Sequence, residues 1–111
     1  MGEYKRMNQE NAIYYGYANQ TNQLIEECAE LIQAINKHKR FMVDGDWSRD
    51  DAAEVNNSLK AHIAEEMADV EVMLMQVRFL IGIDHAQVKE IMKQKIERTT
   101  ARRKWGEVHN E

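Results

Sequence analysis

Hydrophobic positions recur with helical spacing in three stretches of the chain. Between residues 19 and 40 they follow an i, i+4, i+7 pattern, which is typical of one buried helix face. This face comprises Leu24, Cys28, Leu31 and Ile35, with Ile25 and Ile32 beside it. The pattern also predicts a helix over residues 59–81 and a last helix from about 84 to 104. The pair Asp84 and Gln87 forms a capping box at the start of that last helix.

The remaining segments are the two ends of the chain and residues 41–58. Residues 4–18 predict a short helix that ends near Gly16. Residues 41–58 lack an apolar stripe and contain an Asp-Gly turn signal, so we expect a mobile loop there. Residues from about 105 to 111 predict a polar tail. The chain is therefore expected to be one all-α domain over residues 1–111, a bundle of three long helices plus a short N-terminal helix.

Composition agrees with a helical domain and bears on its assembly. The chain has 111 residues, no proline and only five glycines, so helix breakers are scarce. This length is sufficient for one small core. A domain this thin often completes its core by association. We therefore expect at least a homodimer.

Charge and cysteine usage narrow the functional class. The formal net charge of −4 disfavours nucleic-acid binding, which depends on a basic surface. No apolar run approaches the roughly 20 residues of a membrane-spanning helix, and the N-terminus lacks the apolar core of a secretion signal. Cys28 is the single cysteine, which agrees with a reducing cytoplasm. These features predict a cytoplasmic protein with neither a nucleic-acid nor a membrane partner.

Glu66 stands inside the apolar stripe of the helix predicted over residues 59–81. At about 100° per residue, eight apolar side chains project within roughly 80° of it. They are Leu59, Ile63, Val70, Met73, Leu74, Val77, Leu80 and Ile81. A carboxylate on a core face is costly unless it is paired, neutralised or bound to a cation. Glu66 is therefore a candidate functional residue.

Two carboxylate pairs share the i, i+3 spacing that makes helix residues surface neighbours. Glu27 and Glu30 form one pair, and Glu66 and Asp69 form the other. If the two helices lie side by side, four like charges converge, and such charges require neutralisation. Hard divalent cations with oxygen ligands, above all Mg²⁺, suit this arrangement. The alternative is that both pairs are ordinary solvated helix faces.

Basic and amide side chains supply candidate substrate contacts. The apolar stripe of the last helix continues as Lys95, with Arg98 and Arg102 on the following turns, and such groups can clamp phosphate. A lysine reaching solvent from a core edge, or salt bridging with the acids, is the alternative. Gln23 is a candidate substrate-binding residue that could instead cap its helix. Base-stacking and ordinary packing both remain open for the aromatic residues Tyr14, Tyr15, Tyr17 and Trp47.

The motifs resemble those of a known family. Over about residues 14–104, the succession of Glu26-Glu27-x-x-Glu30, Glu66-x-x-Asp69 and Lys95-x-x-Arg98 is similar to the all-α nucleoside triphosphate pyrophosphohydrolases of the MazG-like superfamily, in their short single-domain form. The gap between the two acidic motifs is longer here than in many members, which affects the expected shape of the site entrance.

This resemblance implies a four-helix active-site bundle, completed by oligomerisation in a homodimer or homotetramer. It also implies an Mg²⁺-dependent enzyme, with Mn²⁺ as a substitute, that hydrolyses a (d)NTP to the monophosphate and pyrophosphate. It makes Glu27, Glu30, Glu66 and Asp69 the metal ligands and catalytic residues. It makes the basic side chains of the last helix the phosphate contacts. Two other readings stay open: a non-catalytic helical oligomer acting as an interaction module, and chemistry on phosphoribosyl-ATP.

Overall fold

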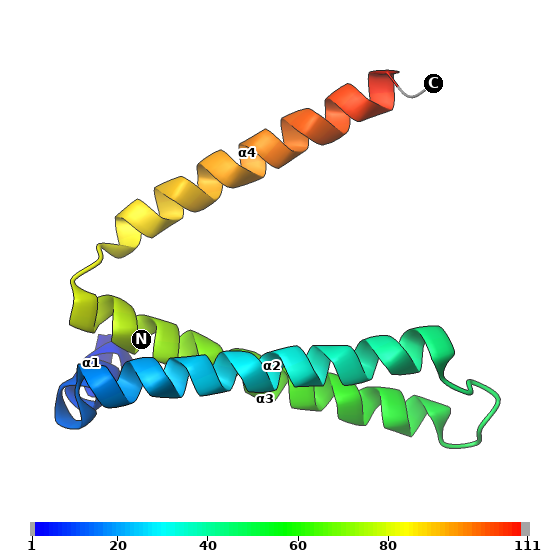
Figure 1. Cartoon of the computed structure of the whole chain (residues 1–111), viewed down its shortest axis with the longest axis horizontal. Helices are drawn as coiled ribbons and strands as arrows, with labels where there is room; N and C mark the ends of the chain where they lie inside the picture. The colour runs from blue at the N-terminus through cyan, green and yellow to red at the C-terminus, as the bar shows by residue number, and fades with distance from the viewer. Residues whose placement is uncertain (1, 110–111) are drawn as a thin grey trace. The chain divides into compact units, whose positions relative to one another are not determined.

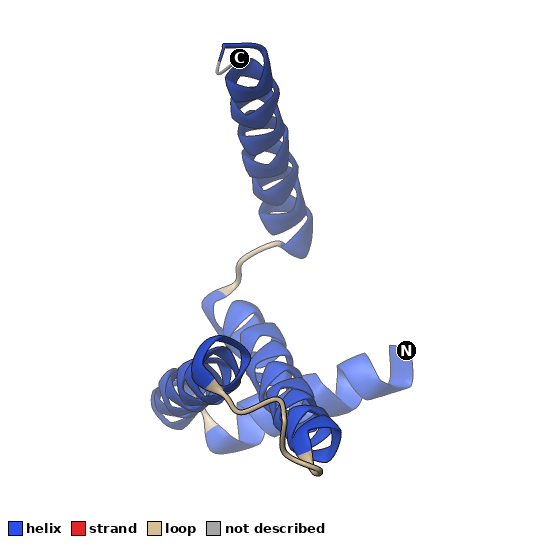
Figure 2. Cartoon of the chain, turned by 90° about the vertical axis from the view of Figure 1, so that its right-hand side faces the viewer, coloured by secondary structure: helices blue, strands red, loops and turns tan. Residues whose placement is uncertain are grey.

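The computed structural model of the chain describes residues 2–109, which form four helices (Figure 1). They are α1 (Gly2–Tyr15), α2 (Tyr17–Asp44), α3 (Ala52–Ile81) and α4 (His85–His109). No strand occurs within these residues, as the colouring of Figure 2 shows. The predicted all-α class, with three long helices and a shorter N-terminal helix, is confirmed.

The chain divides into two compact units after Ile81. The first unit contains α1, α2 and α3, and it holds every buried residue of the described chain. The second unit begins at Gly82 and contains α4, which has no buried residue of its own. Within residues 2–109, no helix combines the length and the apolar character needed to cross a bilayer.

Helices α2 and α3 lie side by side and antiparallel in the first unit (Figure 1). Their buried and half-buried positions alternate at spacings of four and three residues, the pattern of a coiled-coil seam. On α3 these seam positions are Ala52, Asn56, Leu59, Ile63, Glu66, Val70, Met73, Val77 and Leu80. On α2 they are Gln20, Leu24, Glu27, Leu31, Ala34, His38 and Phe41. The seam is narrower than the predicted stripe of α2, because Ile25 and Ile32 are 66% and 59% exposed.

A single glycine joins α1 to α2. Gly16 has φ 86° and ψ 166°, a conformation that residues with a Cβ rarely adopt. Its N–H donates to the Ala12 carbonyl at 2.9 Å, and its own carbonyl accepts from the N–H of Gln20 at 3.0 Å. Both backbone groups of Gly16 are therefore paired at this junction, and α1 packs against both α2 and α3.

The connection between α2 and α3 is shorter than the mobile loop predicted over residues 41–58. Helix α2 continues to Asp44 and α3 begins at Ala52, so only residues 45–51 lie outside a helix. Figure 2 looks at the helix pair from the side of this connection. The prediction was wrong at both boundaries. At the end of α2, Phe41 continues the seam beyond the predicted helix end. At the start of α3, the seam residues are the small Ala52 and the polar Asn56, which leave no hydrophobic periodicity to detect.

Side-chain contacts organise this connection. The Asp46 carboxylate accepts hydrogen bonds from the backbone N–H of Ser48, at 3.0 Å, and from its hydroxyl. Arg49 forms an ion pair with Asp51 at 2.7 Å. The ring of Trp47 packs against that of Phe41, with a centroid distance of 4.8 Å. Trp47 is thus engaged with the end of α2 in this structure.

Helix α4 begins as predicted but ends later than predicted. The Asp84 carboxylate accepts a hydrogen bond from the backbone N–H of Ala86 at 3.0 Å, so Asp84 caps the helix as predicted. The predicted polar tail is helical as far as His109, whose ring stacks on Trp105 at 4.0 Å. The ion pair of Arg103 with Glu107, at 2.8 Å and i, i+4 spacing, also spans these last turns. Residues 110–111 of that predicted tail lie outside the described residues.

Candidate metal centre

Glu66 occupies a seam position of α3, between Ile63 and Val70. It is only 8% exposed, which confirms its predicted placement on the buried face. Its Oε2 atom is buried and has no hydrogen-bond partner within the described residues. An unpaired buried carboxylate oxygen is unfavourable in a core that serves folding alone. The fold therefore holds Glu66 in a position that calls for a ligand.

Glu27 occupies the corresponding seam of α2. Its Oε1 atom accepts a hydrogen bond of 2.7 Å from the side-chain amide of Gln23, one turn earlier on the same helix. Its Oε2 atom is buried and, among residues 2–109, has no partner. The two facing helices thus each contribute one free, buried carboxylate oxygen.

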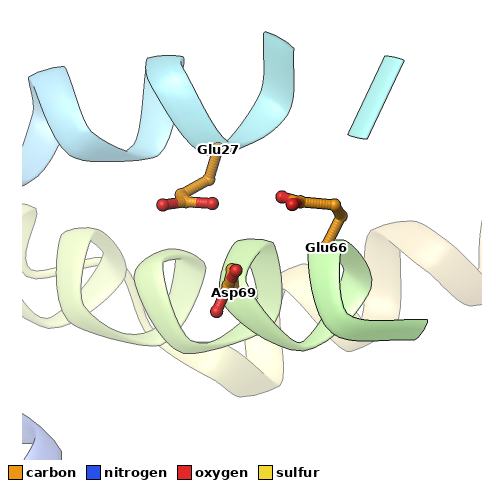
Figure 3. A group of neighbouring side chains, drawn as sticks. All are labelled: Glu27, Glu66 and Asp69. Atoms are coloured by element: carbon orange, nitrogen blue, oxygen red, sulfur yellow. The ribbon is translucent and has the colours of Figure 1, made fainter. Parts of the chain in front are cut away.

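Asp69 completes a group of three carboxylates with Glu27 and Glu66. One oxygen of each lies within 4.8 Å of the others, a separation that a single divalent cation can bridge. Figure 3 shows Glu27 and Glu66 reaching into the space between α2 and α3 from opposite sides. Asp69 projects from α3 beside them and is exposed, so the group has a buried side and a solvent side.

Electrostatics agree with this geometry. Burial is the main cause that raises the pKa of Glu66 above its ordinary value, and the negative charges of Glu30, Glu27 and Asp69 raise it further. His62 acts weakly in the opposite direction. The ionised form of Glu66 is thus disfavoured by its surroundings, and a cation among the carboxylates would restore it. The donor set, three carboxylates of which Glu27 and Glu66 each keep a buried unpaired oxygen, fits a hard divalent ion such as Mg²⁺.

Glu30 is the fourth predicted ligand, and it stands slightly apart. It is exposed and does not belong to the group of three oxygens. After burial, its charge is nevertheless the main cause of the raised pKa of Glu66, ahead of Glu27 and Asp69. The structure thus brings three predicted ligands together and leaves Glu30 at their edge.

The basic residues predicted to contact the substrate lie in the second unit. Lys95, Arg98 and Arg102 are on α4 and all three are exposed. Their predicted place beside the carboxylates stays a prediction. Gln23, the remaining predicted substrate contact, is half-buried in the first unit and bonded to Glu27.

Sequence reasoning missed a chain of amides that links all three helices of the first unit. Gln20 donates to Gln76 at 2.7 Å, Gln76 donates to Asn8 at 2.7 Å, and Asn8 donates to the carbonyl of Val72 at 3.2 Å. Gln20 and Gln76 are 8% and 5% exposed, so both are core residues. In the sequence, only the burial of Gln20 was indicated, because this residue lies seven positions before Glu27 on the same helix.

A polar pocket of about 570 Å³ adjoins the carboxylates at the N-terminal end of α2. It is lined by Tyr15, Asn19, Gln20, Asn22, Gln23 and Glu26. Gln23 belongs to both places, because it lines the pocket and bonds to Glu27. The pocket is thus a candidate for the part of a ligand that extends away from the carboxylates.

Comparison with protein families matches residues 16–106 to the MazG nucleotide pyrophosphohydrolase domain. The chain belongs to this family. The match spans all three acids of the carboxylate group and the basic residues of α4, and it confirms the resemblance seen in the sequence. MazG domains are generally nucleotide pyrophosphohydrolases and are typically metal-dependent, as the carboxylate group suggests. Searches of curated proteins and of solved structures give no significant match.

Proposed function

We propose that this MazG protein is an Mg²⁺-dependent nucleoside triphosphate pyrophosphohydrolase, which converts a (d)NTP to the monophosphate and pyrophosphate. One observation carries the proposal: Glu27 and Glu66 each keep a buried carboxylate oxygen without a hydrogen-bond partner among the described residues. Acids with a purely structural role would find donors. A site for a hard cation instead needs free oxygens on converging side chains.

The proposed roles follow from the position of each acid. Glu27, Glu66 and Asp69 would hold Mg²⁺, for which Mn²⁺ can substitute. When bound, the ion supplies Lewis-acid polarisation of the phosphate and makes a nearby water more acidic. Glu30, exposed at the edge of the group, is free to orient the attacking water and accept its proton.

The basic residues of α4 take the phosphate side of the reaction. Lys95, Arg98 and Arg102 would bind the triphosphate and stabilise the charge that develops on the departing pyrophosphate. Arginine suits this role because its planar guanidinium donates two parallel hydrogen bonds to phosphate oxygens, whereas lysine acts as a point charge. Their match to the MazG domain supports this part of the proposal.

We further propose that the active protein is a homodimer or homotetramer. The buried hydrophobic residues of the described chain are few and mostly small. They are Ala12, Ala34, Ala52, Val70, Met73 and Val77. Large apolar side chains such as Ile13 and Tyr14 are 66% and 81% exposed, which favours their burial against a second copy. A reducing cytoplasm is the proposed location, in agreement with the single Cys28.

The test is a panel of dNTPs and NTPs, together with phosphoribosyl-ATP, incubated with and without Mg²⁺ while pyrophosphate is measured. Glu27→Gln and Glu66→Gln are expected to abolish pyrophosphate release while keeping the helical circular dichroism spectrum. Glu65→Gln removes the same charge at the exposed position next to Glu66 and should retain activity. Activity in either of the first two variants would remove that residue from the metal set. A wild type inactive on the whole panel would contradict the enzyme proposal.

A further inference from the structure

Gln23 controls how many oxygens Glu27 can offer. The amide nitrogen Nε2 of Gln23 lies 2.7 Å from Oε1 of Glu27, and both side chains are half-buried. Oε1 thus has one of its two lone pairs engaged and its direction fixed, whereas Oε2 is buried and without a partner in the described chain. The hydrogen bond thus divides the carboxylate into one held oxygen and one free oxygen.

The chemical nature of the donor matters as much as its position. A lysine or arginine at residue 23 would hold Oε1 equally well but would neutralise the charge that attracts a cation. The glutamine amide is uncharged, so it fixes the orientation of Glu27 and leaves the negative charge available. Spacing of i, i+4 on one helix makes this contact local, because it requires no other element of the fold.

Oxygen number separates the two abundant hard cations. Ca²⁺ takes six to eight oxygens and often binds both oxygens of one carboxylate, whereas Mg²⁺ requires a near-octahedral shell and usually binds one oxygen per carboxylate. We propose that Gln23 is a positioning residue that makes Glu27 a one-oxygen ligand and thereby favours Mg²⁺ over Ca²⁺ at the Glu27–Glu66–Asp69 group. This inference rests on the metal-dependent function proposed above.

Because Gln23 is already bonded to Glu27, contact with the substrate would be a second role for this residue. Gln23 lines the polar pocket beside the carboxylates, which is the position expected of a substrate-binding residue. Its bond to Glu27 nevertheless gives it a function before any substrate arrives. Hydrogen bonds to metal-binding side chains commonly change metal affinity by about 10–100-fold when they are removed.

The experiment measures dissociation constants of the full-length protein for Mg²⁺ alone and for Ca²⁺ alone by isothermal titration calorimetry, without substrate. Gln23→Met keeps the length of the side chain and removes the donor. We expect this change to weaken Mg²⁺ binding and to shift the ratio of the two constants toward Ca²⁺ by about 10-fold. Gln23→Ala, a strong helix former, gives the same readout if the methionine variant does not fold.

Two controls separate the hydrogen bond from other effects. Gln33→Met makes the same chemical change at an exposed position of α2 and should leave both constants unchanged. Gln23→Lys keeps a donor but adds a charge, so both ions should bind more weakly while their ratio stays near that of the wild type. A ratio that moves as far in Gln23→Lys as in Gln23→Met would overturn the role of the donor.

The outcomes also separate this inference from the proposed function. If the wild type binds Mg²⁺ and Ca²⁺, and the ratio is the same in Gln23→Met and Gln23→Ala, the role of Gln23 is refuted and the metal site stands. If the wild type binds neither ion, the metal site itself is refuted, and the role of Gln23 with it.

Discussion

Replacing Glu66 by glutamine should have opposite effects on the metal-free and the metal-bound protein. Burial, together with the neighbouring acids, raises the pKa of Glu66 above the ordinary value of 4.5. A raised pKa in the folded state means that the stability contributed by this group is complete below about pH 4.5 and is lost as pH rises through the folded pKa. At neutral pH the amide carries no charge to bury, so Glu66→Gln is expected to raise the melting temperature of the metal-free protein.

Mg²⁺ should reverse this order, so that the wild type melts at a higher temperature than Glu66→Gln. A ligand at 100 times its dissociation constant stabilises the folded state by about 2.7 kcal/mol. For a domain of this size that corresponds to a rise in melting temperature on the order of 10 °C. Glu66→Gln removes one of the two buried free oxygens and the charge that goes with it, so most of this rise should disappear.

The assay is thermal unfolding, followed by circular dichroism from pH 4.5 to pH 8, with and without Mg²⁺. Glu65→Gln is the matched control, since it removes the same charge from an exposed neighbour on α3. The reasoning is refuted if Glu66→Gln melts at a lower temperature than the metal-free wild type at neutral pH. An Mg²⁺-induced rise as large in Glu66→Gln as in the wild type would refute the metal site.

Three further substitutions test the scaffold and the phosphate side. Gly16→Ala should lower the free energy of unfolding, measured by urea titration, by about 1–3 kcal/mol. The added Cβ meets no neighbouring atom but strains the backbone at φ 86°. An unchanged free energy would show that the turn relaxes. Gln76→Leu leaves the buried Gln20 and the half-buried Asn8 without their amide partner and should cost about 1–3 kcal/mol by the same titration, against little for the exposed Gln33→Leu. Lys95→Gln should raise KM for the triphosphate by roughly 10-fold in steady-state kinetics, the loss of one charge-assisted hydrogen bond. Equal effects in Lys93→Gln would indicate general attraction by α4 instead.

The buried acid was predictable because helical periodicity reports burial directly. Glu66 interrupts a stripe of apolar residues, and a stripe determines which side of a helix faces the core. The same reasoning brought Glu27, Glu30 and Asp69 to one place, since it required only that two adjacent helices pack side by side. Of these, the structure places Glu30 at the edge of the group.

Two other features could not be predicted from hydrophobic periodicity. The first turns of α3 are formed by Ala52 and Asn56, whose burial comes from contact with α2 and not from their hydrophobicity. The bonded pair of Gln20 and Gln76 is separated by 56 residues, and no local pattern connects the two amides. Their pairing depends on the alignment of two whole helices, which a single sequence does not reveal.

The amide pair fixes the longitudinal register on which the carboxylates depend. Glu27 follows Gln20 by seven residues, and Asp69 precedes Gln76 by seven, so the amide pair and the acids stand one heptad apart in the antiparallel helices. Two heptad seams can slide past each other by a full repeat, about 10 Å, without losing apolar contact. Such a slide would separate the amides, and a buried polar pair is known to select one alignment among several. A pair of uncharged amides outside the carboxylate group thus selects the alignment in which the carboxylates meet.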